Sequence, residues 1–430
     1  MIQKLTLKNF KSFSEPKVHE GQWEGTSISF GGLSLIVGTN ASGKSNIRDG
    51  LRFIHAISRG YTLAEIIGEK YGEEGVLQWK GIRGGVRETV TRNGNSADEQ
   101  FTISVTTKLA SEDGGDLAHY SITVNLGQRP RAPRVVAESL MLGRESKPRF
   151  ETRCFDSITS EARGWWNPPL SGKWAYHLPA DRPAITQLVE DQELSGVEGS
   201  QNLCRSFLRT ISSVRFLDLD PNSLRRPSIP GQTVLGDKGE NLSSVLQAIC
   251  NDDSSKESLI EWTRELTPLD VVDLKFPEVS QEGKIQLQLV EQGGREISAE
   301  SASDGTLRFL AFAAAVLGTE PARFYFFEEI ENGIHPNRAH LLINLLQTAT
   351  KDGVIQVVGT THSPALLNYL DEDALKNASL VYRVGPVSKI ARLGEILALG
   401  QTPVGTRAGD LLSSGWFENV AAFLEAENEQ

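Results

Sequence analysis

Cysteine is scarce in this chain, and long apolar runs are missing from it. The 430 residues include three cysteines, Cys154, Cys204 and Cys250, and no two of them have the spacing of metal ligands. The longest clean apolar run, Phe309 to Leu317, is too short to span a bilayer. The opening MIQKLTLKNF lacks the apolar segment of a signal peptide. These absences favour a cytoplasmic protein with no membrane partner, in a reducing compartment.

Positive charge is also in short supply. The chain has 44 lysines and arginines against 55 acidic residues, which gives a formal net charge of -11. A protein that coats nucleic acid over its whole surface would usually be basic, so any contact with nucleic acid must be a local patch. A solvated surface is the more common explanation for such a basic run. The candidate patch comprises Arg129, Arg131, Arg134, Arg144, Lys147, Arg149 and Arg153.

The length of the chain predicts two or three packed lobes rather than one core. Short alternating runs between residues 60 and 150 indicate antiparallel strands. The next part is less regular, with helical segments expected near 183–213 and 240–265. We therefore expect a β-rich first lobe, a mostly helical insertion and a second lobe, with the boundaries 1–150, 151–270 and 271–430.

A glycine-rich loop stands between an apolar run and a helical pattern. It reads GTNASGKS, from Gly38 to Ser45. Residues 33–37 before it are typical of a buried parallel strand, and after it apolar residues recur at helical spacing. Strand, loop and helix in this order are the context that a phosphate-binding loop requires. The chain is therefore expected to bind a nucleoside triphosphate.

The chemistry of the loop assigns roles to its residues. Glycines 38 and 43 let the backbone curl so that its N–H groups and the helix N-terminus face the phosphates. Lys44 should reach the β- and γ-phosphates, and the Ser45 hydroxyl should bind Mg²⁺. The expected ATP-binding residues are Asn40, Ala41, Ser42, Gly43, Lys44 and Ser45.

Two carboxylates follow a short aromatic strand far downstream, in the stretch FYFFEE. In open α/β sheets, ligands bind at the carboxyl ends of the strands. Glu328 is the expected partner of Mg²⁺, and Glu329 is placed to orient or deprotonate the attacking water. Because neighbouring strand residues point to opposite faces, two acids can take these different roles only where the chain begins to turn.

Two further segments carry polar groups to phosphate-binding positions. A predicted strand over 354–358 ends in GTTHSP, so His362 can approach the γ-phosphate. The stretch SASDGTLR precedes an alanine-rich helical run. Ser303 can cap that helix, and the helix N-terminus would form a second anion site. As an isolated motif the second segment is weak, and its meaning comes from its place in the chain.

The order of these motifs resembles that of ABC-type ATPases of the RecF- and SMC-like branch. GTNASGKS is similar to their Walker A loop, SASDGTLR to their signature motif, and FYFFEEIENGIHP to their Walker B motif, catalytic glutamate and D-loop. The opening LTLKNFKSF resembles their first strand. The resemblance implies an α/β P-loop ATPase head with ATP and Mg²⁺ as cofactors. It implies catalytic roles for Glu329 and His362, and a metal-binding role for Ser45 with Glu328.

The resemblance also implies a homodimer or a higher oligomer. ATP on Lys44 and Ser45 of one copy would meet the signature of a second copy, arranged head to tail, and hydrolysis would release the pair. The implied signature residues are Ser303, Asp304, Gly305 and Thr306. Relatives of this kind are ATPase subunits of bacterial anti-phage systems, in the OLD-like, Septu-like and Gabija-like groups. The chain after His362 is too short for the nuclease domain of the OLD-like group, so we expect a separate effector subunit, with a nuclease as one candidate.

Glu328 departs from the family pattern, and three further points concern the glutamine loop, a pair of aspartates and the alternative functions. Glu328 stands where much of the class has aspartate. Gln78 is the candidate position for the glutamine loop. Asp218-Leu219-Asp220 has the look of a nuclease metal site, but its place before a Pro-Asn turn favours a structural role. Two alternatives to the ATPase switch remain: an ATP-bound scaffold with negligible turnover, and a DNA-maintenance ATPase of RecF type.

Overall fold

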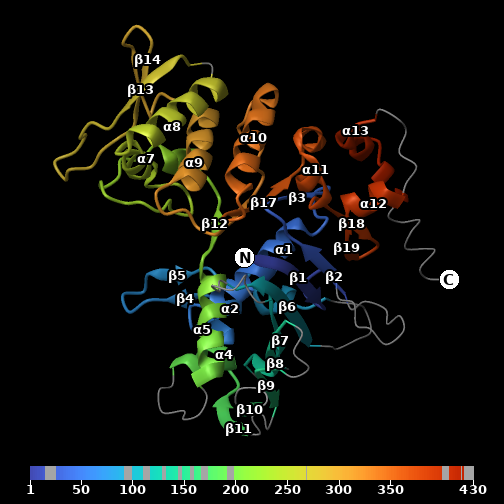
Figure 1. Cartoon of the computed structure of the whole chain (residues 1–430). Coiled ribbons are helices and arrows are strands. Elements are labelled where there is room, and N and C mark those ends of the chain that lie inside the picture. Colours follow the sequence, from blue (N-terminus) through green and yellow to red (C-terminus); the bar gives the residue numbers. More distant parts are fainter. Residues whose placement is uncertain are drawn as a thin grey trace. The chain divides into compact units, whose positions relative to one another are not determined.

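The chain forms two compact units, seen here in a computed structural model (Figure 1). The first unit comprises residues 1–30, 39–213 and 381–390, and the second comprises 31–38, 214–380 and 391–430. This division differs from the expected boundaries at 150 and 270. The structure describes residues 1–14, 26–91, 99–109, 117–127, 132–143, 148–154, 159–165, 173–190, 198–267, 269–399, 406–417 and 419–420.

An eight-stranded sheet forms the first unit. Its strands are β1 (Ile2–Lys8), β2 (Thr26–Ser29), β6 (Gln100–Lys108), β7 (Leu117–Asn125), β8 (Arg134–Leu142), β9 (Phe150–Cys154), β10 (Thr159–Trp165) and β11 (Lys173–Pro179). They lie in the order β11-β10-β9-β8-β7-β6-β1-β2, and every neighbouring pair is antiparallel. The strands expected before residue 150 are therefore confirmed. The sheet also continues through β9–β11, into the segment for which a helical insertion was expected.

The first unit also contains the helices α1 (Lys44–Ile57), α2 (Leu63–Ile67), α3 (Gly85–Glu88), α4 (Ala184–Glu190) and α5 (Glu198–Ser212), and a small hairpin adds β4 (Lys70–Tyr71) and β5 (Leu77–Trp79). Helices α1 and α5 pack on the sheet through apolar side chains. Phe207 of α5 packs on Tyr120 of β7, with ring centroids 4.9 Å apart. Helix α1 approaches β1 so closely that a Cβ at Gly50 would lie 2.8 Å from Leu7 Cδ2. Glycine at position 50 thus permits the close packing of the helix that follows the phosphate loop.

A buried carboxyl group ties α4 to the sheet. Glu138 of β8 is 2% exposed, and it accepts hydrogen bonds from the Tyr120 hydroxyl and from the N–H groups of Ala184 and Ile185 at 2.9, 2.6 and 2.9 Å. Burial raises the pKa of Glu138 to about 7. The three donors compensate this carboxyl group for the loss of water and fix the start of α4.

A six-stranded sheet underlies the second unit. Its strands are β12 (Val214–Leu217), β16 (Phe324–Phe327), β17 (Gln356–Thr361), β3 (Leu33–Val37), β18 (Ser379–Val384) and β19 (Val387–Arg392), in that order; residues 381–390 group with the first unit. The pairings from β12 to β18 are parallel. Every residue of β3 and of β16 is buried, as expected. The carboxyl ends of these parallel strands lie at one edge of the sheet.

The extent of β17 corrects one expectation. The strand was predicted over 354–358, but Val354 is 62% exposed and the strand runs from Gln356 to Thr361. Gly359 does not end the strand, because its backbone pairs with Leu35 of β3. Its missing side chain makes room for a neighbour instead, since a Cβ there would lie 2.7 Å from Ile330 Cγ2.

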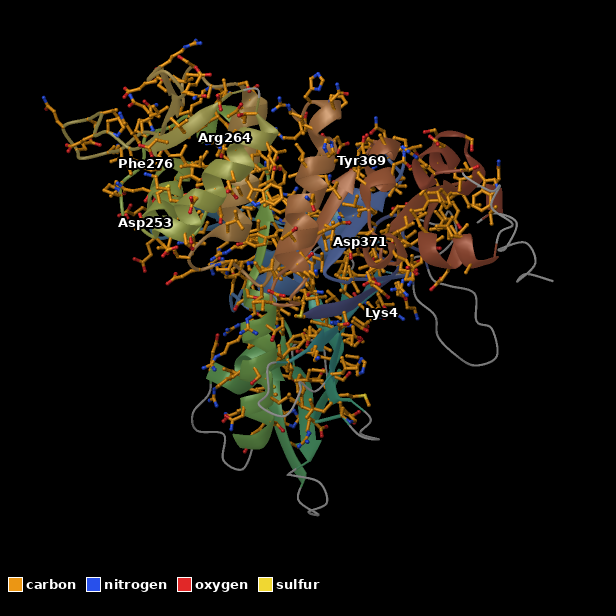
Figure 2. All side chains as sticks on the ribbon, turned by 45° about the horizontal axis from the view of Figure 1, so that its top comes forward. Lys4, Asp253, Arg264, Phe276, Tyr369 and Asp371 are labelled. Carbon is orange, nitrogen blue, oxygen red and sulfur yellow. The ribbon has the colours of Figure 1, made fainter. Side chains whose placement is uncertain are left out.

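The described part of the second unit contains the helices α6 (Pro221–Leu224), α7 (Leu242–Cys250), α8 (Asp253–Leu266), α9 (Asp304–Leu317), α10 (Ala339–Thr350), α11 (Glu372–Lys376), α12 (Leu393–Leu399) and α13 (Ala408–Ser413). Helix α9 is the alanine-rich helix predicted from the sequence. Helix α9 contacts α6, α7, α8 and α10, which explains its almost wholly apolar sequence (Figure 1). Figure 2 marks Asp253 and Arg264 near the two ends of α8.

Smaller elements complete the second unit. They are the three-stranded sheet β13 (Val271–Lys275), β14 (Gln288–Glu291) and β15 (Glu296–Ser298), and 3-10 turns at Pro336–Arg338 and Pro364–Tyr369. Across the described parts of both units, none of the helices combines the length and the apolar character needed to cross a membrane.

Candidate functional site: a phosphate loop and a polar sheet edge

The phosphate loop is a tight curl of backbone after β3. Gly38 and Gly43 have φ angles of 156° and 119°, and Ala41 has a φ of 60°, in the left-handed region that non-glycine residues rarely enter. A Cβ at Gly43 would lie 2.6 Å from Ser388 Oγ, so only glycine fits there. The structure thus confirms the expected strand, loop and helix, and the curl leaves Asn40 and Ala41 exposed.

The polar side chains of the loop fit an anionic ligand. Lys44 is 7% exposed, and its Nζ donates to the Thr39 carbonyl oxygen at 2.9 Å. Ser42 Oγ is buried and has no hydrogen-bond partner among the described residues. Ser45 stands beside Lys44 at the start of α1 and is half-buried. A cationic amine and a hydroxyl group without a partner, both beside a glycine curl, suit a polyphosphate ligand.

The paired carboxylates leave β16 at the carboxyl edge of the second unit's sheet. Glu328 and Glu329 follow the last strand residue directly, and Glu329 has a φ of 48°. The chain therefore turns at the pair, as expected from the need to give the two acids different directions. The Glu329 N–H donates to Thr360 Oγ1 at 3.0 Å, and the Ile330 N–H donates to the Thr360 carbonyl at 3.1 Å. This strained backbone is held by the neighbouring strand β17.

His362 lies beside Glu329 in the structure, a contact that the sequence analysis did not name. His362 Nε2 is 3.7 Å from Glu329 Oε1, and both side chains remain partly exposed. The backbone N–H of His362 donates to Glu331 Oε1 at 2.7 Å, while Glu331 Oε2 is buried without a partner in the described part of the chain. Glu331 was not predicted, although it stands only two residues after Glu329. Its hydrogen bond fixes the segment that carries His362.

The N-terminus of α9 is built as predicted. Ser303 is the N-cap, and its Oγ accepts the N–H of Thr306 at 3.1 Å. A Cβ at Gly305 would lie 2.4 Å from the carbonyl oxygen of Gly333. Glycine at 305 therefore permits a close backbone contact with the segment after the carboxylate pair. Arg308 adds a hydrogen bond to the carbonyl of Asn332 at 3.3 Å.

An arginine outside the expected motif holds the same helix start. The Arg225 guanidinium donates to the Ala302 carbonyl at 2.9 Å and to Asp304 Oδ1 at 2.6 Å. It thereby partly neutralises the acidic residue at the first position of α9, where an anion would otherwise be repelled. No local pattern around Arg225 points to this role, because its partners lie almost eighty residues away.

Other candidates stay outside these sites. Gln78 is exposed on β5, and its glutamine-loop role stays a prediction. Asp220 caps α6 by accepting the Ser223 N–H at 2.9 Å, which gives it the structural role favoured above. The described residues contain no cluster of three His, Cys, Asp or Glu side chains that could hold a metal. Burial raises the pKa of the free thiols of Cys204 and Cys250.

Most of the candidate basic patch cannot be placed. Arg134 lies at the start of β8, and Arg149 just precedes β9. The other members of the patch lie outside the described residues or have side chains that do. They are Arg129, Arg131, Arg144, Lys147 and Arg153. The side chain of Cys154 is likewise outside the described part of the chain.

Comparison with known proteins extends these observations. Residues 203–368, which include the capped helix and the carboxylate pair, match a family model described as "AAA domain, putative AbiEii toxin, Type IV TA system". A relative from Helicobacter pylori (strain ATCC 700392 / 26695), named ATP/GTP phosphatase, is 22% identical over 381 residues, covering 86% of this chain and 88% of the relative. The solved structure of an SMC head bound to the C-winged helix domain of ScpA is similar with a TM-score of 0.50 and 16% identity, covering 93% of this chain and 99% of that one.

The structural likeness confirms the expected fold class, an α/β P-loop head. The family model and the relative support the enzyme class that the phosphate loop predicts, an ATPase. The likeness to an SMC head domain is one of fold, and none of these matches confirms the anti-phage groups of the resemblance. The chain has the α/β P-loop fold of an SMC head domain, and the family match and the relative indicate that it hydrolyses ATP.

Proposed function

We propose that the chain is an ATP-driven switch, which binds and hydrolyses ATP and passes its nucleotide state to a partner. The observation that carries this proposal is the composition of one sheet edge in the second unit. Strand β3, which runs into the phosphate loop, lies next to β17, which leads to His362, and β17 lies next to β16, which leads to Glu329. A phosphate-binding loop and a positioned carboxylate are the parts that ATP hydrolysis needs.

In this proposal the loop residues, from Asn40 to Ser45, bind the phosphates through backbone N–H groups, the Lys44 amine and the α1 N-terminus. Glu329 orients the attacking water and accepts its proton, and His362 lies beside Glu329 to support that geometry. Ser45 and Glu328 would hold Mg²⁺. Each of these side chains offers an oxygen of the kind that Mg²⁺ binds, and Mg²⁺ on a nucleotide usually takes one or two protein ligands besides phosphates and water. When bound, Mg²⁺ neutralises charge that develops on the phosphates.

The α9 N-terminus suggests how two copies cooperate. Ser303, Asp304, Gly305 and Thr306 present a capped helix start of the kind that binds anions. In a head-to-tail homodimer, this start would contact ATP held by the loop of the second copy, and two equal composite sites would form. ATP then joins the two copies, and hydrolysis separates them. Because both composite sites are used within such a dimer, a higher oligomer would need a further contact surface.

Arg225 provides a specific prediction for this contact. The Arg225→Ala variant should hydrolyse ATP about fivefold more slowly, because a partly exposed ion pair contributes about 1 kcal/mol to the position of Asp304. The affinity of one chain for ATP should not change. Arg226→Ala is the matched control, since it removes a neighbouring exposed arginine. Equal phosphate-release rates for the two variants would contradict this role.

We further propose that the switch acts in anti-phage defence with a separate effector subunit, a nuclease being one candidate. The family description that names a putative AbiEii toxin of a Type IV TA system is compatible with a defence role. The acidic balance of the chain disfavours the RecF-type alternative, in which the protein would grip DNA.

The phosphate loop offers the direct test of ATPase function. The wild-type protein should release phosphate from Mg-ATP, and Lys44→Ala should lower that rate by about 100-fold, because a cation that stabilises developing phosphate charge contributes several kcal/mol. Lys4→Ala is the control, since Lys4 is an exposed lysine on β1. Phosphate release at the background rate by a wild-type protein that still binds ATP would favour the scaffold alternative. Unchanged turnover in Lys44→Ala would remove the loop from the mechanism.

A further inference from the structure

Ser388 of β19 is a buried residue in direct contact with the phosphate loop. It is 0% exposed. Its Oγ lies 2.5 Å from the Ser42 carbonyl oxygen and 2.6 Å from Ser12 Oγ, and its N–H donates to the Ser12 carbonyl at 2.8 Å. Gly43 leaves the space that Ser388 occupies. All of these residues belong to the first unit, although Ser388 is hundreds of positions away from the others in sequence.

The donors and acceptors form a chain with one direction. A carbonyl oxygen only accepts, so the Ser388 hydroxyl donates to Ser42 O and must accept from Ser12 Oγ. Ser12 Oγ in turn accepts from Asn46 Nδ2 at 2.7 Å. The chain therefore runs from Asn46 through Ser12 and Ser388 to Ser42. This series of hydrogen bonds begins in the first turn of α1 and ends at the phosphate loop. It therefore connects the helix to the loop through residues that belong to neither.

A second contact fixes the same N-terminal segment to α1. Lys11, next to Ser12, has its Nζ 2.5 Å from Asp49 Oδ2, and the two side chains are 7% and 2% exposed. Arg83 pairs with the same carboxylate at 2.9 Å. Ser12 is thus held against α1 independently of its own hydrogen bonds. It gives Ser388 a rigid partner.

Peptide geometry explains what this chain does for a ligand. In a trans peptide the carbonyl of one residue and the N–H of the next point to opposite sides. The bond from Ser388 holds the Ser42 carbonyl toward β19, so the N–H of Gly43 is turned to the other side of the loop. Backbone N–H groups aligned before binding cost less to order when phosphates arrive.

We propose that Ser388 is a positioning residue for the phosphate loop. It holds the peptide between Ser42 and Gly43 in its phosphate-binding orientation. The affinity of the loop for nucleotide therefore depends on the position of β19, which follows β18 after a two-residue turn. This inference rests on the proposed binding of ATP by the loop.

Hydrogen–deuterium exchange without nucleotide tests the inference apart from the proposed function. In Ser388→Ala, amides of residues 39–46 should exchange about tenfold faster, because the Ser42 carbonyl loses its buried partner. ATP affinity should fall about tenfold, while turnover at saturating ATP changes less than twofold. Ser379→Ala is the matched control: it removes a hydroxyl of β18 that is buried without a partner among the described residues. It should leave exchange and affinity unchanged.

A second variant keeps the test decisive if Ser388→Ala folds poorly. Ser12→Ala breaks the same chain from its other end, and the double variant should bind ATP no more weakly than the weaker single variant. Wild-type exchange and wild-type ATP affinity in both folded single variants would overturn the role of Ser388. If the loop exchanged faster in the variants but the wild-type protein bound no ATP, the positioning role of Ser388 would stand. The proposed binding of ATP would then be overturned instead.

Discussion

The Glu329→Gln variant is expected to lose ATP hydrolysis and keep ATP binding. Glutamine preserves the size of the side chain and the backbone bond to Thr360, but its amide cannot accept a proton from water. General-base catalysis contributes about 100- to 10,000-fold, so turnover at saturating Mg-ATP should fall by at least about 100-fold. Phosphate release measures the loss, and binding of a fluorescent ATP analogue measures what remains.

A glutamate far from the polar sheet edge serves as the control for this change. Glu257 is an exposed residue of α8, and Glu257→Gln removes the same charge. Its turnover should equal that of the wild type. If Glu329→Gln hydrolysed ATP as fast as Glu257→Gln, the assignment of the base would be wrong, and His362 or Glu331 would become the next candidates.

Two inactive variants are expected to restore each other when they are mixed. Lys44→Ala should disable the loop, and Ser303→Glu places a negative charge at the helix start that is proposed to contact the phosphates of the second copy. In a head-to-tail pair of one copy each, one composite site combines the intact loop of the Ser303→Glu chain with the intact signature of the Lys44→Ala chain. Random pairing gives half mixed dimers with one good site each, so about a quarter of wild-type turnover should return.

The control for mixing uses two changes on the same side of the site. Lys44→Ala and Glu329→Gln both act on the copy that holds ATP, so their mixture contains no intact site and should stay inactive. Recovery in the first mixture alone supports a signature that acts across the dimer. If neither mixture recovered, the α9 N-terminus would have to act within its own chain or with a different partner.

Local signals in the sequence predicted much of the candidate site. The strand–loop–helix around Gly38–Ser45, the aromatic strand before Glu328 and the Ser303 cap are each encoded within about ten neighbouring residues. Short-range patterns of this kind depend on backbone geometry and apolar spacing, which are visible without a structure. The rule that ligands bind at the carboxyl ends of parallel strands placed both Glu329 and His362 at strand ends, although their contact with each other was not predicted.

Features that depend on distant partners were not predictable in this way. Ser388 contacts Ser42 from 346 positions away, and Arg225 reaches Asp304 across 79 positions. The course of β17 was misjudged because Gly359 is a strand breaker by propensity, whereas tertiary pairing with β3 overrides that preference. Strands β9–β11 were missed for the same reason, since their pairing rather than their composition defines them.

The oligomeric state of Glu329→Gln tests the switch most directly. Its mass in solution should be measured by light scattering, without nucleotide and with saturating Mg-ATP. A composite site that ATP closes and hydrolysis opens predicts a shift from monomer to dimer, or to a higher state, when ATP is added. The same monomer mass under both conditions, in a protein that binds ATP, would contradict the head-to-tail switch.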